Sequence, residues 1–369
     1  MPAAGRDIVS ELGCRTFINA AGTYTRLTAS RMPDEVVAAI QVAATKFCDL
    51  NELQDRVGER IASRLECEAA MVSAGCASAL TLGTAACVAG DDPDLIKRLP
   101  DTEGMKGEVI IQKGHRIGYD HAIRNTGITL IEVETREELE KAVNENTAMM
   151  AFINTKAPDG QIQHEEFVEI ARAKGVPTLI DAAADIPPVD NLWRFTKMGF
   201  DLVAFSGGKG LRGPQSAGLL LGRKRLIAAA RLNNSPNSDA VCRTNKVNKE
   251  ELVGMLAALE LYLDQDHEAV WADWEGRCDR IAEAVADVEG VSTETFVPEL
   301  ANAVPHLRVN WDAGARGLTP TQASDAMRDG EPSVEVRPGA TKTLEIAVWM
   351  MNPGEEELVG KRLREVLTA

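Results

Sequence analysis

The stretch DLVAFSGGKGLRGPQ (residues 201–215) joins an apolar run to a single lysine set among glycines. Such a run, closed by glycines, is typical of a buried strand that ends in a tight turn. Lys209 would then stand at a strand end, where its amine can act as a nucleophile. The alternative is a surface lysine in a flexible loop, which leaves the glycines on both sides without a structural purpose.

A second short run, VPTLID (residues 176–181), predicts another buried strand. Asp181 closes this strand, 28 residues before Lys209. A lysine that forms a Schiff base and an acid that keeps a pyridine nitrogen protonated are the two fixed points of a pyridoxal phosphate site. The two strand ends therefore indicate pyridoxal 5'-phosphate as a cofactor.

Between residues 60 and 225, apolar runs alternate with helical patterns, which predicts an α/β fold with a mainly parallel sheet and helices on both faces. Seven strands are expected, at residues 69–73, 108–112, 129–133, 148–154, 177–181, 202–205 and 218–221. Residues 250–265 predict a long helix, and an α+β pattern follows it. We therefore expect an N-terminal segment (1–50) packed near the site or a partner subunit, a large cofactor-binding domain (51–250), and the linking helix with a small C-terminal domain (251–369).

Composition excludes several classes of function. The formal net charge of −16 and the sequence pI of about 4.9 oppose binding to nucleic acid and to anionic membranes. The seven cysteines form no C-x-x-C pair, which argues against a zinc site and a disulfide framework. No apolar stretch is long enough for a signal peptide or a membrane span, so we expect a cytoplasmic protein.

A phosphate site is expected in the stretch MVSAGCASAL (residues 71–80), which reads as a strand, a turn of small residues and a helix start. The backbone N–H groups at Gly75, Cys76, Ala77 and Ser78 would bind a phosphate even in an acidic protein. The Ser206 hydroxyl can donate to the same phosphate. Two alternatives stay open: the small residues only permit close helix packing, and the serine only forms a turn.

The stretch GHRIGYDH (residues 114–121) gathers two histidines and a tyrosine after a predicted strand. A flat ring can stack on the cofactor, and an imidazole can act as an acid or base near neutral pH. His115, nearest the strand end, is our candidate for both roles, whereas His121 is a candidate helix cap.

The substrate candidates are basic. Arg243 and Lys246 lie in a locally basic segment before the long helix, and Arg212 follows the lysine motif. In an acidic protein such residues can receive an anionic substrate, although a solvated helix terminus is an alternative for the segment. Arg308 and Arg337 are further candidates for a substrate carboxylate, because guanidinium binds carboxylate through two parallel hydrogen bonds.

The chain also resembles a known family. The motifs at residues 17–23, 119–124, 181–188, 206–215 and 246–250 are similar to those of the selenocysteine-synthase-like branch of fold type I pyridoxal phosphate enzymes, closest to the D-glucosaminate-6-phosphate ammonia-lyase group. The resemblance implies a fold type I transferase-like architecture. It implies that Lys209 forms the Schiff base, that Asp181 binds the pyridine nitrogen, and that Ser206, Ala183 and the turn at residues 75–78 contact the cofactor.

One segment departs from the family pattern. Where the resemblance implies Leu-Gly-Gly-Ser, this chain has Leu27-Thr28-Ala29-Ser30. The resemblance further implies a homodimer or larger homo-oligomer and a lyase that eliminates ammonia from a hydroxylated amino acid or amino-sugar acid. A racemase, an aldolase or an aminotransferase would use the same residues, and a tRNA-dependent selenium transferase is opposed by the charge.

Overall fold

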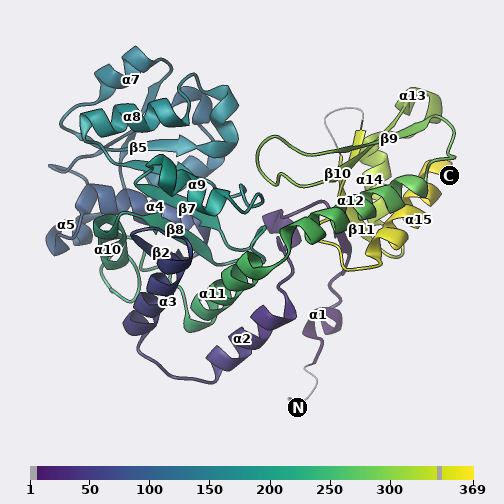
Figure 1. The fold of residues 1–369 in the computed structure, drawn as a ribbon, viewed down its shortest axis with the longest axis horizontal. Helices are drawn as coiled ribbons and strands as arrows, with labels where there is room; N and C mark the ends of the chain where they lie inside the picture. The colour runs from purple at the N-terminus through teal and green to yellow at the C-terminus, as the bar shows by residue number, and fades with distance from the viewer. Residues whose placement is uncertain (1–5, 339–342) are drawn as a thin grey trace. The chain divides into compact units, whose positions relative to one another are not determined.

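The computed structural model describes residues 6–338 and 343–369, which form two compact units (Figure 1). The larger unit comprises Ala29–Gln265 and Leu300–Ala303. The smaller unit comprises the chain up to Thr28, Asp266–Glu299 and Val304–Ala369. The N-terminal residues thus join the C-terminal part of the chain, and the long helix expected to open the small domain lies within the larger unit.

The larger unit is built on a seven-stranded, mainly parallel sheet with the strand order β2-β8-β7-β6-β5-β3-β4. The strands are β2 (Ala69–Ser73), β3 (Glu108–Gln112), β4 (Thr129–Val133), β5 (Thr147–Ile153), β6 (Thr178–Asp181), β7 (Leu202–Ser206) and β8 (Gly218–Gly222). Only β8 runs antiparallel to its neighbours β2 and β7. The α/β fold class and all seven expected strands are confirmed, with ends that differ by no more than one residue.

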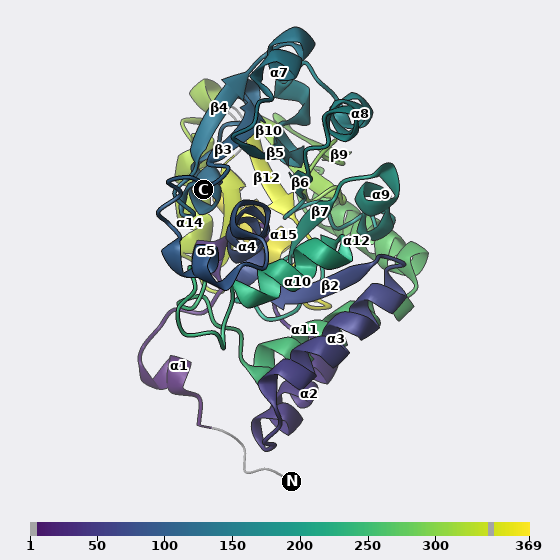
Figure 2. The ribbon, with the colours of Figure 1, turned by 90° about the vertical axis from the view of Figure 1, so that its left-hand side faces the viewer.

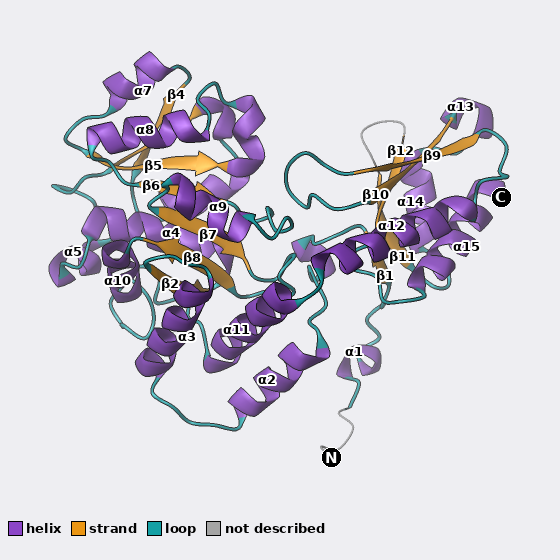
Figure 3. Ribbon diagram, viewed as in Figure 1, coloured by secondary structure: helices purple, strands orange, loops and turns teal. Residues whose placement is uncertain are grey.

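Helices bury both faces of this sheet, which explains the nearly continuous apolar strands (Figure 3). Because side chains alternate along a strand, Leu179 and Ile180 belong to two different core clusters. One cluster packs on the α4 side of the sheet and the other on the side of α3, α8, α9 and α11. Helix α4 (Gly75–Ala89) is apolar around its circumference and almost entirely buried, as a helix that spans a sheet face must be.

The remaining helices of the larger unit are α2 (Asp34–Ala44), α3 (Leu50–Arg64), α5 (Pro93–Arg98), α6 (His121–Arg124), α7 (Arg136–Ala142), α8 (His164–Lys174), α9 (Asn191–Met198), α10 (Lys224–Leu232) and α11 (Lys249–Asp264). Helices α2 and α3 both pack along α11 (Figure 2). Within residues 6–338 and 343–369, no helix combines the length and apolar character that crossing a bilayer requires.

The smaller unit has a five-stranded mixed sheet with the order β1-β11-β12-β10-β9. Its elements are α1 (Ile8–Glu11), β1 (Ile18–Ala20), α12 (His267–Glu283), β9 (Val291–Phe296), β10 (His306–Trp311), α13 (Ala313–Arg316), α14 (Pro320–Arg328), β11 (Val334–Pro338), β12 (Thr343–Ala347) and α15 (Glu355–Thr368). Strand β1 pairs in parallel with β11, which ties the N-terminal residues to the C-terminal ones.

Candidate active site

The carboxyl ends of β2, β6 and β7 bring several predicted residues to one edge of the sheet. Asp181 ends β6 and Ser206 ends β7. The alternation of side chains turns Asp181 to the same face as Leu179, and Ser206 to the same face as Ala204. Both of these apolar residues pack on the α4 side. The acid, the serine and the N-terminal end of α4 therefore share one face of the sheet.

Close backbone packing fixes the lysine loop after β7. A Cβ atom at Gly210 would lie 2.1 Å from the carbonyl oxygen of Ile186, and one at Gly208 would lie 2.4 Å from the Cα of Gln215. The Arg212 N–H closes the turn by donating to the Lys209 carbonyl oxygen at 3.0 Å. The glycines are thus required by the packing, and the half-buried Lys209 extends from a well-packed turn.

Asp181 is 7% exposed, and both of its hydrogen bonds fall on one oxygen. Its Oδ1 accepts from the Ala183 N–H at 2.9 Å and from the Cys76 thiol at 3.5 Å. Burial raises the pKa of Asp181, while the Ala183 hydrogen bond and the positive charge of Lys209 oppose that rise. Lys209 therefore lies within electrostatic reach of this carboxylate.

The turn between β2 and α4 leaves the first N–H groups of the helix available. Gly75 adopts a left-handed φ of +76°, and Ala74 offers no side-chain cap. Strand β8 packs closely against this turn, since a Cβ atom at Gly218 would lie 2.5 Å from the Gly75 carbonyl carbon. A helix N-terminus without a cap presents unpaired donors and a partial positive charge, which together favour an anion.

The basic segment lies beside this turn. Asn245 contacts the Ser78 hydroxyl through its side-chain amide, at 3.4 Å. In the same segment, Arg243 is half-buried and Lys246 is exposed. In the described part of the chain, neither side chain has a hydrogen bond or ion pair. Arg212 is engaged instead, because its Nε donates to the Arg31 carbonyl oxygen at 3.0 Å.

His115 lies apart from this group of residues. Its ring is completely buried and meets Phe152 edge-on at 4.5 Å, and its Nδ1 accepts from the Ile153 N–H at 3.3 Å. Phe152 belongs to the core on the face opposite α4. Burial, helped by His164, lowers the pKa of His115 to about 4, so the ring is neutral at physiological pH. Among the described residues, the His115 ring has no hydrogen bond or ring contact with Asp181, Lys209 or the α4 turn, and its stacking and acid–base roles stay a prediction.

Residues 17–271 match the family described as "SelA: L-seryl-tRNA selenium transferase". The chain belongs to this family. The D-glucosaminate-6-phosphate ammonia lyase of Salmonella typhimurium (strain 14028s / SGSC 2262) is 29% identical over 98% of both chains. A 5'-C-glycyluridine monooxygenase-decarboxylase of a Streptomyces species is 31% identical over 96% of this chain and 91% of its own.

A solved structure of D-glucosaminate-6-phosphate ammonia-lyase superposes with a TM-score of 0.87 at 28% identity, covering 100% of this chain and 99% of the other. The fold is that of fold type I pyridoxal phosphate enzymes, as expected. Relatives of similar identity are named for different activities. Membership of the SelA family therefore does not define the reaction, which depends on the residues of the site.

A buried acid near the site, Asp185, was not predicted as part of it. Asp185 is 3% exposed and its Oδ2 has no hydrogen-bond partner among the described residues. Burial raises the pKa of Asp185 to about 6, Asn154 opposes that rise through a hydrogen bond, and the charge of Asp181 adds to it. Asn154 in turn bonds His164 at 2.6 Å. The spacing of Asp181 and Asp185 was visible in the sequence, but their burial was not.

The segment that departs from the family pattern contacts the lysine loop. The Ser30 hydroxyl donates to the Gly208 carbonyl oxygen at 2.8 Å, directly before Lys209. Thr28 and Ala29 both have left-handed φ values, of 63° and 59°. The glycines implied by the resemblance at these two positions adopt such values without strain. The larger side chains here thus keep a glycine-like backbone at a conformational cost.

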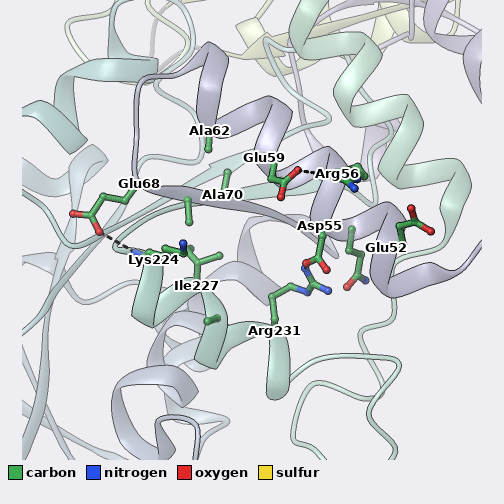
Figure 4. A pocket seen from close by; sticks show the side chains of 14 residues that line it. Glu52, Asp55, Arg56, Glu59, Ala62, Glu68, Ala70, Lys224, Ile227 and Arg231 are labelled. Carbon is green, nitrogen blue, oxygen red and sulfur yellow. Dashed lines mark hydrogen bonds and ion pairs between the residues drawn. The ribbon is translucent and has the colours of Figure 1, made fainter.

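A separate pocket of about 570 Å³ lies between α3, β2 and α10 (Figure 4). Its charged side chains largely pair with one another, as in the ion pairs Arg231–Asp55 and Arg56–Glu59. None of the predicted site residues lines it. Its volume alone does not make it the active site, because the groups suited to cofactor chemistry lie at the carboxyl ends of the strands.

Proposed function

We propose that this chain is a pyridoxal phosphate lyase that releases ammonia from a hydroxylated amino acid or amino-sugar acid. The observation that carries the proposal is that three groups lie at one edge of the sheet. They are the carboxylate of Asp181, the half-buried Lys209 and the uncapped N-terminus of α4. A lyase of this kind needs an acid, an amine and an anion site together. Similarity to the Salmonella ammonia lyase supports the same assignment.

The residues fit the cofactor at both of its ends. A Cβ atom at Gly75 would meet nothing within 4 Å, which leaves space above the α4 N-terminus for a phosphate. Gly75, Cys76, Ala77 and Ser78 would bind that phosphate through backbone N–H groups, with the Ser206 hydroxyl beside them. The second oxygen of Asp181 would hold the ring nitrogen protonated. When bound, pyridoxal phosphate supplies an electron sink for the bonds at the substrate Cα.

Lys209 would hold the cofactor and then move one proton. Its neutral Nζ would take the proton from the substrate Cα, after which the β-hydroxyl leaves with a proton as water. Water later adds back to the unsaturated product and ammonia departs, so the net products are a 2-oxo acid and ammonia. The Ala183 N–H and the Cys76 thiol both donate to Oδ1 of Asp181 and favour its ionised form, against the burial that raises its pKa.

The basic segment would select the substrate. Arg243 and Lys246 lie next to the α4 turn through Asn245, and their side chains have no partner among the described residues. In a chain of net charge −16 they are suited to a second anionic group on the substrate, such as a phosphate. The same net charge opposes a tRNA substrate.

The test is release of ammonia and a 2-oxo acid from D-glucosaminate 6-phosphate, with unphosphorylated glucosaminate, serine and threonine as controls. We expect ammonia from the phosphorylated substrate. Racemisation or transamination without ammonia would move the assignment to a racemase or an aminotransferase, and retro-aldol cleavage to an aldolase. Because the Streptomyces relative is 31% identical, oxygen uptake with a glycyl-nucleoside is also measured, and a positive result there would contradict the lyase assignment.

A further inference from the structure

Cys76 connects the two ends of the candidate cofactor site. It is the second residue of α4, where the backbone N–H groups are free for a phosphate. Its thiol lies 3.5 Å from Oδ1 of Asp181 at the end of β6. The backbone position is fixed from β8, because a Cβ atom at Gly218 would lie 2.7 Å from the Cys76 nitrogen. One residue therefore belongs to the phosphate turn and also contacts the acid.

The thiol is a hydrogen-bond donor here. Burial raises the pKa of Cys76 well above its usual range, and the negative charge of Asp181 raises it further. The sulfur therefore keeps its proton and donates it to the carboxylate. A protonated, buried thiol is also a poor nucleophile, which separates Cys76 from reactive cysteines.

Both donors to Asp181 act on the same oxygen. The Cys76 thiol and the Ala183 N–H both reach Oδ1, whereas Oδ2 has no hydrogen-bond partner in the described part of the chain. The two donors come from different elements, helix α4 and the loop after β6, and together they restrict rotation of the carboxylate. Oδ2 is thereby the oxygen left for a ligand.

We propose that Cys76 is a positioning residue, whose thiol holds Oδ1 of Asp181 so that Oδ2 faces the ring nitrogen of the cofactor. The inference rests on the proposed function, since it takes Asp181 as the acid that binds that nitrogen. The other titratable groups within electrostatic reach of Asp181 are Lys209 and Asp185. A simpler alternative is that Cys76 only fills space in the core on the α4 side, to which it belongs.

Two substitutions separate positioning from packing. Cys76→Ala removes the donor, and Cys76→Ser restores an O–H donor at the same place. Cys87→Ala is the matched control, because Cys87 lies further along the same helix and has no contact with Asp181. All variants are prepared as apoprotein and reloaded with pyridoxal phosphate. The readouts are the affinity of the apoprotein for the cofactor, the pH titration of the bound cofactor's visible spectrum, and the pH profile of kcat/KM.

Loss of the thiol donor removes an interaction that lowers the pKa of Asp181. Activity requires this acid to be ionised, so the acid limb of the Cys76→Ala profile should move to higher pH. A shift of about 0.3–1 pH unit corresponds to one ordinary hydrogen bond. Cofactor affinity and the spectral titration should change with it. Cys76→Ser should restore all three readouts, and Cys87→Ala should leave them unchanged.

The inference would be overturned if Cys76→Ala changed thermal stability but left the spectral titration and the acid limb as in the unmodified protein. An Asp181→Asn variant keeps this outcome distinct from failure of the proposed function. If Asp181→Asn is inactive while Cys76→Ala titrates normally, Asp181 keeps its assigned role and Cys76 loses its own. If Asp181→Asn is fully active, the acid lies elsewhere and both proposals fail.

Discussion

Replacing Gly210 by alanine should destabilise the larger unit and displace Lys209. The new Cβ atom would lie 2.1 Å from the carbonyl oxygen of Ile186 and 2.8 Å from its carbonyl carbon. The backbone at Gly210 or Ile186 therefore has to move. Overpacking of this kind costs about 1–3 kcal/mol. The lower entropy of the unfolded alanine chain offsets about 0.4–1 kcal/mol of that cost. For a unit of this size, the remaining cost of about 0.6–2 kcal/mol lowers Tm by about 1–8 °C.

The matched control is Gly118→Ala, because a Cβ atom at Gly118 meets nothing within 4 Å. This exposed residue should tolerate alanine with no loss of stability. Thermal unfolding followed by circular dichroism compares both variants with the unmodified chain. Displacement of the neighbouring Lys209 by about 1 Å should also cut turnover by about a hundredfold. A Gly210→Ala variant with unchanged Tm and turnover would refute the argument that the glycines are required by packing.

Three further predictions concern the site and its assembly. Asp181→Ala should keep the fold, as monitored by circular dichroism, but lower turnover about a hundredfold or more, as loss of a preorganised electrostatic partner does; near-normal turnover would show that another group is the acid. Arg243→Ala should raise KM for a phosphorylated substrate by about tenfold or more, and more than it lowers kcat, because a charged hydrogen bond contributes about 1.5–3 kcal/mol; an equal effect on the unphosphorylated control would argue against this contact. Light scattering should find a homodimer or larger assembly, and an active monomer at assay concentration would contradict that expectation.

Most strands of the larger sheet were predictable because they are short apolar runs buried on both faces, whereas the edge strand β4 is partly exposed. The lysine loop was predictable for a related reason: glycines on both sides of Lys209 are rare unless backbone must approach backbone. The structure supplies the contacts that make this necessary at Gly208 and Gly210. The local sequence pattern was therefore sufficient to predict these strands and the lysine loop.

Side-chain direction after a strand was not predictable. His115 follows β3 through a short 3-10 turn, and that turn directs its ring to Phe152 on the face opposite α4. The pairing of β1 with β11 also escaped prediction, because β11 lies more than three hundred residues further along the chain. Pairings between such distant segments leave no signal in either segment alone.

The burial of Asp185 has the same origin. Its carboxyl is enclosed by residues from separate parts of the chain, namely Asn154 after β5 and the backbone at Ala301. The sequence shows only an aspartate four positions after Asp181. Burial depends on the assembled fold, so the perturbed carboxyl becomes visible only in the structure.

The central claim, that Lys209 carries the cofactor, is tested most directly by borohydride reduction of the protein loaded with pyridoxal phosphate. Reduction fixes the Schiff base as a stable pyridoxyl-lysine, and peptide mapping by mass spectrometry then locates it. We expect a single adduct, on Lys209, and none in a Lys209→Ala variant. An adduct on another lysine, or no adduct on a protein that has bound the cofactor, would contradict the account.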